Sequence, residues 1–264
     1  MKKFKNIAIV SFSVLVLLAL LGLAEANKRD LTFNDLKVSI DKSEGNYFVD
    51  EVDIESQVFA KGYQKGKEPI RNVDLRVLET QFDNMPSVKK AEVYSSINGM
   101  LHVDIKQRTP IARIFTRTSS FYLDKAGYVM PLSDKYTAKV PVVNGALNID
   151  YSVVSGLNFA EPNELMKINF ESRKLHEAYL LAKKFKEVPF WDAQFKQIYF
   201  KQNGDIELIP AVGNHVIIID GAEHIDESLT KLMILYKEGL SKTGWNNYKE
   251  INLKYKDQIV CIKR

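Results

Sequence analysis

The alternation of apolar and polar positions begins only after a long apolar run near the N-terminus. Residues 7–24 are uncharged and mostly apolar. Eighteen helical residues extend about 27 Å, close to the roughly 30 Å hydrocarbon core of a bilayer. We therefore predict a transmembrane helix over residues 6–24, preceded by a cytoplasmic tail of residues 1–5.

The charges that flank this run predict its orientation and leave its processing open. Lys2, Lys3 and Lys5 precede the run, so the positive-inside rule keeps the N-terminus cytoplasmic and places the rest of the chain outside. A cleaved signal peptide is the alternative, because Ala24-Glu25-Ala26 fits a cleavage site. The run is longer than the roughly 7–15 apolar residues of a signal peptide, which favours a retained, single-pass anchor.

Residues 31–108 predict a small unit in the order strand, helix, helix, strand, strand. Residues 31–41 alternate as a strand, and residues 50–63 and 69–86 have helical spacing. Two alternating runs then flank Asn98-Gly99, the strongest short-range signal for a hairpin. Such a pair predicts a type I′ turn, which needs a positive φ at both residues.

Residues 109–264 predict a mostly antiparallel β domain with flanking helices. Short strand patterns are separated by turn signals such as Asp124-x-x-Gly127 and Asn203-Gly204. Two amphipathic helices are expected, over residues 161–185 and 226–240, the second capped by Asp226 or Ser228. Residues 251–264 are predicted to be the closing strand. The fold class is therefore α+β.

Composition and charge exclude several classes of protein. The chain has 264 residues, 45% of them hydrophobic, so most of its length should fold. Its formal net charge is +4, and three of the lysines precede the apolar run, which leaves no electrostatic case for nucleic acid. Cys261 is the single cysteine, which rules out an internal disulfide and a multi-cysteine metal site.

Motifs for catalysis are incomplete. His176-Glu177 begins like H-E-x-x-H, but Leu180 stands at the position of the second histidine. Residues 62–69 resemble a P-loop, but Glu68 stands where Ser or Thr would bind Mg²⁺. The residues therefore provide no catalytic constellation, and an enzyme is the weaker hypothesis.

The C-terminal strand admits two interpretations. If it lies at a sheet edge, its free N–H and C=O groups can accept an extended partner segment by β-augmentation. If it lies inside the sheet, it only seals the core. Lys254, Lys256 and Lys263 fit a guarded edge as well as a solvent-facing strand.

The order of these features resembles the FtsQ/DivIB family of bacterial cell division proteins. A basic tail and one span precede the strand-helix-helix-strand-strand unit, and the sequences QRTPIARIF, VPVVNG and EINLKYKDQIVCIKR follow it. The sequence INLKY looks like the family's I-D-L-R-Y, with Asn252 in place of the acid and Lys254 in place of Arg. The resemblance implies a POTRA (polypeptide-transport-associated) domain over residues 31–108 and a β domain over residues 109–264.

The resemblance also implies a function that is not enzymatic, with no catalytic residues, metal, cofactor or small-molecule substrate, and it implies a binding surface. FtsQ-like proteins are scaffolds of the septal division machinery (the divisome) in the cytoplasmic (inner) membrane, with most of the chain periplasmic or otherwise extracytoplasmic. They bind two small single-pass proteins, FtsB and FtsL, and their last strands take up a strand of FtsB. Carried over by position, the partner-binding residues are Lys254, Tyr255, Asp257, Gln258, Ile259, Val260 and Cys261.

Two other readings remain. POTRA domains also occur in envelope protein-secretion and assembly components, which usually carry several of them before a transmembrane β-barrel. Residues 109–264 lack a series of roughly ten-residue lipid-facing strands, which disfavours that class. A membrane-anchored envelope hydrolase is disfavoured by the incomplete catalytic motifs.

Overall fold

The structure, a computed structural model, describes residues 11–22, 31–162 and 164–264. Residues 11–22 form a helix that exposes apolar side chains such as Phe12, Leu15 and Leu18. The predicted tail, both ends of the predicted span and the Ala24-Glu25-Ala26 site lie outside the described residues. Of the helices in the described ranges, none combines the length and apolar character needed to cross a bilayer.

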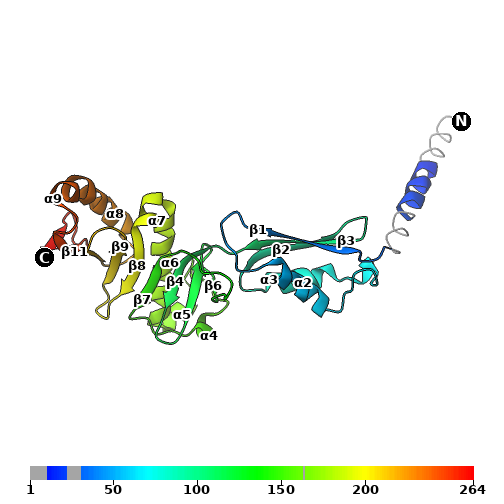
Figure 1. The fold of residues 1–264 in the computed structure, drawn as a ribbon, viewed down its shortest axis with the longest axis horizontal. Helices are drawn as coiled ribbons and strands as arrows, with labels where there is room; N and C mark the ends of the chain where they lie inside the picture. The colour runs from blue at the N-terminus through cyan, green and yellow to red at the C-terminus, as the bar shows by residue number, and fades with distance from the viewer. Residues whose placement is uncertain (1–10, 23–30, 163) are drawn as a thin grey trace. The chain divides into compact units, whose positions relative to one another are not determined.

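The described residues divide into two compact units, the first ending at Gln107 and the second beginning at Arg108. The first unit contains β1 (Asp35–Asp41), α2 (Glu51–Ala60), the 3₁₀ turn η1 (Ile70–Asn72), α3 (Leu75–Asp83), β2 (Val88–Ser95) and β3 (Met100–Gln107). Its sheet has the order β1-β3-β2, with β1 parallel and β2 antiparallel to β3 (Figure 1). This is the predicted order of strands and helices.

Side-chain caps set where the two helices of the first unit begin. The Asp50 side chain accepts from the Asp53 N–H and the Asp53 side chain from the Asp50 N–H, a reciprocal capping box for α2. Asp74 caps α3, so this helix begins at Leu75 and not at Pro69 as predicted. Apolar side chains on both helices, including Ile54 and Leu78, are fully buried.

The β2–β3 hairpin forms as predicted, but its turn is not type I′. Gly99 has a φ of 78°, whereas Asn98 is not among the residues with positive φ. The Gly99 N–H donates to the Ser96 carbonyl over 3.1 Å, which closes a turn in which only the glycine needs the left-handed region. A Cβ at this position would lie 2.3 Å from the Thr32 carbonyl oxygen.

The second unit is built on one nine-stranded sheet with the order β12-β11-β10-β9-β8-β7-β4-β5-β6. Its strands are β4 (Pro110–Phe115), β5 (Ser120–Asp124), β6 (Val129–Met130), β7 (Val142–Gly145), β8 (Phe195–Phe200), β9 (Ile206–Pro210), β10 (Val216–Ile219), β11 (Tyr248–Asn252) and β12 (Val260–Lys263). The pairs β4–β7, β7–β8 and β10–β11 are parallel, and the other neighbours are antiparallel. The α+β fold class with a mostly antiparallel sheet is therefore confirmed.

Helices cover the sheet of the second unit. They are α4 (Tyr151–Val154), α5 (Glu164–Ile168), α6 (Phe170–Glu187), α7 (Pro189–Gln194), α8 (Ile225–Ile234), the π-helical turn η2 (Leu235–Leu240) and α9 (Ser241–Thr243). Leu175 of α6 and Leu232 of α8 lie in one buried cluster with Ile198 and Ile217 of the sheet. This shared core, built from side chains of both the helices and the strands, holds the helices against the sheet.

Two predicted features of the second unit are wrong. His224 occupies the N-cap position of α8 without a side-chain cap, and Asp226 and Ser228 lie in the first turn. Residues 251–264 form the end of β11, a turn and β12 rather than one closing strand. Asp257 in that turn has a φ of 57°, a conformation that breaks a continuous strand.

A candidate partner-binding edge at the C-terminus

The last strand lies at one end of the nine-stranded sheet. β12 pairs antiparallel with β11, and β11 pairs parallel with β10 on its other side. Figure 1 shows this end of the chain, in red, at the margin of the second unit. Within the described residues β12 therefore has a strand neighbour on one flank only.

Two hydrogen bonds show which backbone groups of β12 point outward. The Arg264 N–H donates to the Asn247 carbonyl over 3.2 Å, and the Leu253 N–H donates to the Ile218 carbonyl of β10 over 2.9 Å. Because the N–H and C=O groups of successive residues alternate in direction, those of Val260 and Ile262 face β11. The corresponding groups of Cys261 and Lys263 point away from the sheet.

The side chains of this edge divide between two faces. Ile259 and Cys261 pack against the hydrophobic core, and burial raises the pKa of the Cys261 thiol, which keeps it a protonated packing group. Val260 and Ile262 are 41% and 40% exposed. The strand therefore presents an apolar pair beside its outward backbone groups.

Lys254 anchors the segment that leads into the turn. Its Nζ lies 2.7 Å from Asp205 Oδ1 at the tip of the β8–β9 hairpin. The hydrogen bond from Lys254 lowers the pKa of Asp205, and the same bond raises the pKa of Lys254. The Lys254 N–H also donates to the Asn252 side chain over 3.2 Å, so both residues that depart from the family motif are engaged within the chain.

A lysine of α8 holds the backbone of the same segment. Lys231 Nζ donates to the carbonyls of Leu253 and Tyr255 over 2.9 and 2.8 Å. Its ion pair with Glu227 at 3.2 Å keeps the lysine over this position. The start of the turn is therefore fixed by α8 and by the β8–β9 hairpin together.

The structure brings the seven predicted residues together in one hairpin. Lys254 is partly buried in its ion pair, Tyr255, Asp257 and Gln258 are exposed in the turn, and Ile259 leads into β12. Val260 and Cys261 lie in the strand itself. Ile262 and Lys263 lie in the same strand but are not among the predicted residues. The sequence pattern does not show that this segment forms two strands, and so it does not indicate their place at the edge.

Comparison with models of protein families shows which family the chain belongs to. A family model described as FtsQ/DivIB, C-terminal related, matches residues 109–262. The chain belongs to the FtsQ/DivIB family. A POTRA-like domain model matches residues 33–106, and a search among curated proteins found no match. The resemblance in the sequence motifs is thus confirmed, and the chain is a division-associated protein with a POTRA-like domain.

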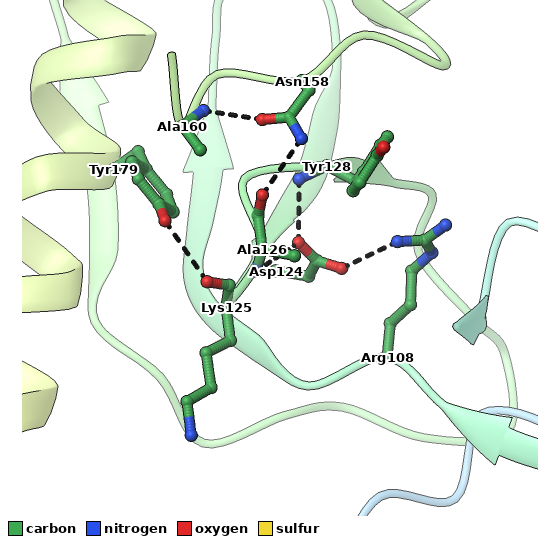
Figure 2. A network of polar contacts seen from close by, with 8 residues as sticks. All are labelled: Arg108, Asp124, Lys125, Ala126, Tyr128, Asn158, Ala160 and Tyr179. Carbon is green, nitrogen blue, oxygen red and sulfur yellow. Dashed lines mark hydrogen bonds and ion pairs between the residues drawn. The ribbon is translucent and has the colours of Figure 1, made fainter. Parts of the chain in front are cut away.

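The D-x-x-G turn of the FtsQ/DivIB-related unit is held by a polar network centred on the buried Asp124 (Figure 2). Asp124 is 1% exposed, and its Oδ1 accepts from the N–H groups of Ala126 and Tyr128 over 2.9 and 2.8 Å. Its Oδ2 accepts from Arg108 Nη1 over 3.0 Å. The Arg108 guanidinium also stacks on the Tyr128 ring, 4.5 Å from its centroid.

Groups from two other segments complete this network. Asn158 Nδ2 donates to the Ala126 carbonyl over 3.1 Å, and Asn158 Oδ1 accepts from the Ala160 N–H over 2.7 Å. The Tyr179 hydroxyl of α6 donates to the Lys125 carbonyl over 3.3 Å (Figure 2). Since these contacts join the turn to neighbouring segments of the same unit, we interpret the network as structural.

The His176-Glu177 pair also makes internal contacts. His176 Nδ1 lies 2.7 Å from the Phe159 carbonyl, and Glu177 accepts from the Ala222 N–H over 3.1 Å. Burial raises the pKa of Glu177. In the part of the chain that the structure describes, no group of three or more His, Cys, Asp or Glu side chains could hold a metal ion.

Proposed function

We propose that the chain is a non-enzymatic, bitopic membrane scaffold of the bacterial divisome that binds FtsB- and FtsL-like proteins by strand addition to β12. The observation that supports this proposal is the one-sided pairing of β12. A partner strand would receive the outward backbone groups of Cys261 and Lys263 and would cover the exposed side chains of Val260 and Ile262.

The partner surface that we propose comprises the turn as well as the strand. Exposed Tyr255 offers an aromatic side chain beside the edge, and aromatic residues are frequent anchors of interfaces. Lys254 is proposed to act by holding the turn in place through Asp205. Cys261 is proposed to bind the partner through its outward backbone groups. The side chains of Cys261 and Ile259 are proposed to keep the edge in place by packing against the core.

The remaining parts of the proposal concern the membrane. Residues 6–24 are proposed as the span, with residues 1–5 in the cytoplasm, residues 31–108 as the POTRA domain and residues 109–264 as the β domain outside. The apolar side chains exposed along residues 11–22 are consistent with a lipid-facing helix. Concentration at the division septum is part of the proposal and is supported by membership of the family.

The second candidate is an envelope secretion or assembly component. The POTRA-like match favours it, since such domains occur in those machines. The FtsQ/DivIB-related match covers the larger unit and favours the division role.

Co-purification from membranes separates these functions. The full chain should retain FtsB- and FtsL-like proteins of the same cell, and a fluorescent fusion should gather at midcell only when residues 1–30 are present. Retention of outer-membrane assembly proteins in their place would favour the second candidate. Hydrolysis of purified peptidoglycan by the chain would overturn the non-enzymatic role.

A further inference from the structure

The first unit has an edge strand of its own, and its backbone directions can be derived in the same way. β2 lies at one end of the order β1-β3-β2. The Ser96 N–H donates to the Met100 carbonyl over 3.0 Å, so in the regular pairing from Lys90 onward the backbone groups of the even-numbered residues of β2 face β3. The N–H groups of Ala91 and Val93 therefore point away from the sheet.

Carboxylates from α3 occupy both of these outward donors. Asp83 Oδ1 accepts from the Ala91 N–H over 2.7 Å, and Glu79 Oε2 accepts from the Val93 N–H over 3.2 Å. Glu79 and Asp83 are four residues apart on one helix, so they lie on the same face of α3. Their spacing matches the two-residue repeat of the outward donors along β2.

We infer that Glu79 and Asp83 close the β2 edge against strand addition. An incoming strand would have to displace two charge-assisted hydrogen bonds before it could offer its own carbonyl groups, and such bonds are stronger than those between neutral groups. The outward groups of β12, in contrast, lie at an edge that no strand covers within the described residues. The β2 and β12 edges therefore differ in a way that favours β12 over β2 for a partner strand.

The closed edge would otherwise accept a second copy of the chain. In an antiparallel pairing of two β2 strands with Ala91 opposite Ala91, Lys90 of each copy would face Glu92 of the other. Opposite charges across a strand pair stabilise it. Lys90 and Glu92 now pair with each other within one copy and are exposed, so they are free to exchange partners. Self-association is thus the expected consequence of opening this edge.

The test compares two double variants of the full chain in detergent. In Glu79→Ala/Asp83→Ala the acceptors are lost, whereas Glu79→Gln/Asp83→Asn keeps a carbonyl oxygen at both positions. At a dilution at which the alanine variant is monomeric, we expect the amides of Ala91 and Val93 to exchange with deuterium about tenfold faster or more than in the wild type, the effect of losing about 1.5 kcal/mol. Analytical ultracentrifugation should show dimers of that variant and monomers of the amide variant and the wild type.

A single variant distinguishes the loss of one hydrogen bond from a general loss of folding. Glu79→Ala should accelerate exchange at Val93 and leave Ala91, which Asp83 still holds, unchanged. Equal exchange at both amides in the wild type and the alanine variants would overturn the inference. So would an alanine double variant that exchanges faster when dilute and still stays monomeric as its concentration is raised.

Discussion

Lys254 and Asp205 form an ion pair, with 2.7 Å between Nζ and Oδ1, that joins the segment before the last turn to the tip of the β8–β9 hairpin. The two side chains are 30% and 21% exposed. The pair fixes the position from which the chain turns into β12. It thereby links a residue of the family motif to the geometry of the proposed binding edge.

Removing either partner should slightly lower the free energy of unfolding of the second unit at neutral pH. A double-mutant cycle with Lys254→Met and Asp205→Asn is expected to give a coupling of about 0.2–1 kcal/mol in the free energy of unfolding by urea. The pKa of Asp205 is lowered in the folded chain, so this contribution is present above the unfolded value and is lost as pH falls through the folded one. Coupling that persists after the carboxyl is protonated would contradict the ionic origin.

The Arg108–Asp124 pair should matter more, because Asp124 is buried. Arg108→Ala leaves the carboxylate of Asp124 without its charged partner, and we expect a loss of about 3–5 kcal/mol in the free energy of unfolding of unit 2. Asp124→Asn should cost less than Asp124→Ala, because an amide oxygen can still accept from Ala126 and Tyr128. Urea titrations followed by tryptophan fluorescence measure all three, and equal costs for Asn and Ala would argue against the backbone bonds.

Gly127 tests the packing of the same turn. It has a φ of 88°, and a Cβ there would lie 2.4 Å from the Ala160 nitrogen. Gly204, with a φ of 92° and nothing within 4 Å of such a Cβ, provides the matched control. Gly204→Ala should cost roughly 1–2 kcal/mol from the left-handed backbone alone, and Gly127→Ala clearly more. Equal melting temperatures would show that the Ala160 segment moves aside freely.

His215 should give unit 2 part of its sensitivity to acid. It is 2% exposed, its Nε2 lies 3.3 Å from the Tyr236 hydroxyl, and burial lowers its pKa. The unfolded chain then binds a proton at a higher pH than the folded chain, so stability falls as pH drops below the unfolded value near 6.5. In His215→Gln the free energy of unfolding should decline less between about pH 7 and pH 5 than in the wild type. Parallel pH profiles would exclude this histidine as a contributor.

The sequence predicts well where local signals and the core agree. The helical face with Leu175, Ala178, Tyr179 and Ala182 is buried as its spacing indicates, and the Asn98-Gly99 and Asn203-Gly204 hairpins form. The predicted helix over residues 161–185 is interrupted, because the Asn169 side chain accepts from the N–H groups of Glu171 and Ser172 and starts α6 anew. Such a local competition between a cap and helix continuation is hard to read from periodicity.

The candidate edge was predictable in position but not in detail. The alternation along residues 251–255 continues past the end of β11 at Asn252 and so does not indicate where the strand ends. Leu253 lies beyond the strand but is still buried. The turn depends on Lys231 from α8 and Asp205 from a distant hairpin, contacts that no local pattern contains. The register of β12, which decides which N–H groups point outward, is set by its pairing with β11.

The most direct test is the affinity of the full chain for an extended peptide from its FtsB-like partner, measured for Cys261→Pro and Cys261→Ala. Proline removes an outward N–H while the bonds of Val260 and Ile262 to β11 remain, and an edge strand tolerates it when that N–H faces solvent. Alanine removes the same side-chain packing but keeps the N–H. We expect proline to weaken binding by about tenfold or more relative to alanine, with similar melting temperatures. Equal affinities of the two folded variants would contradict strand addition at β12.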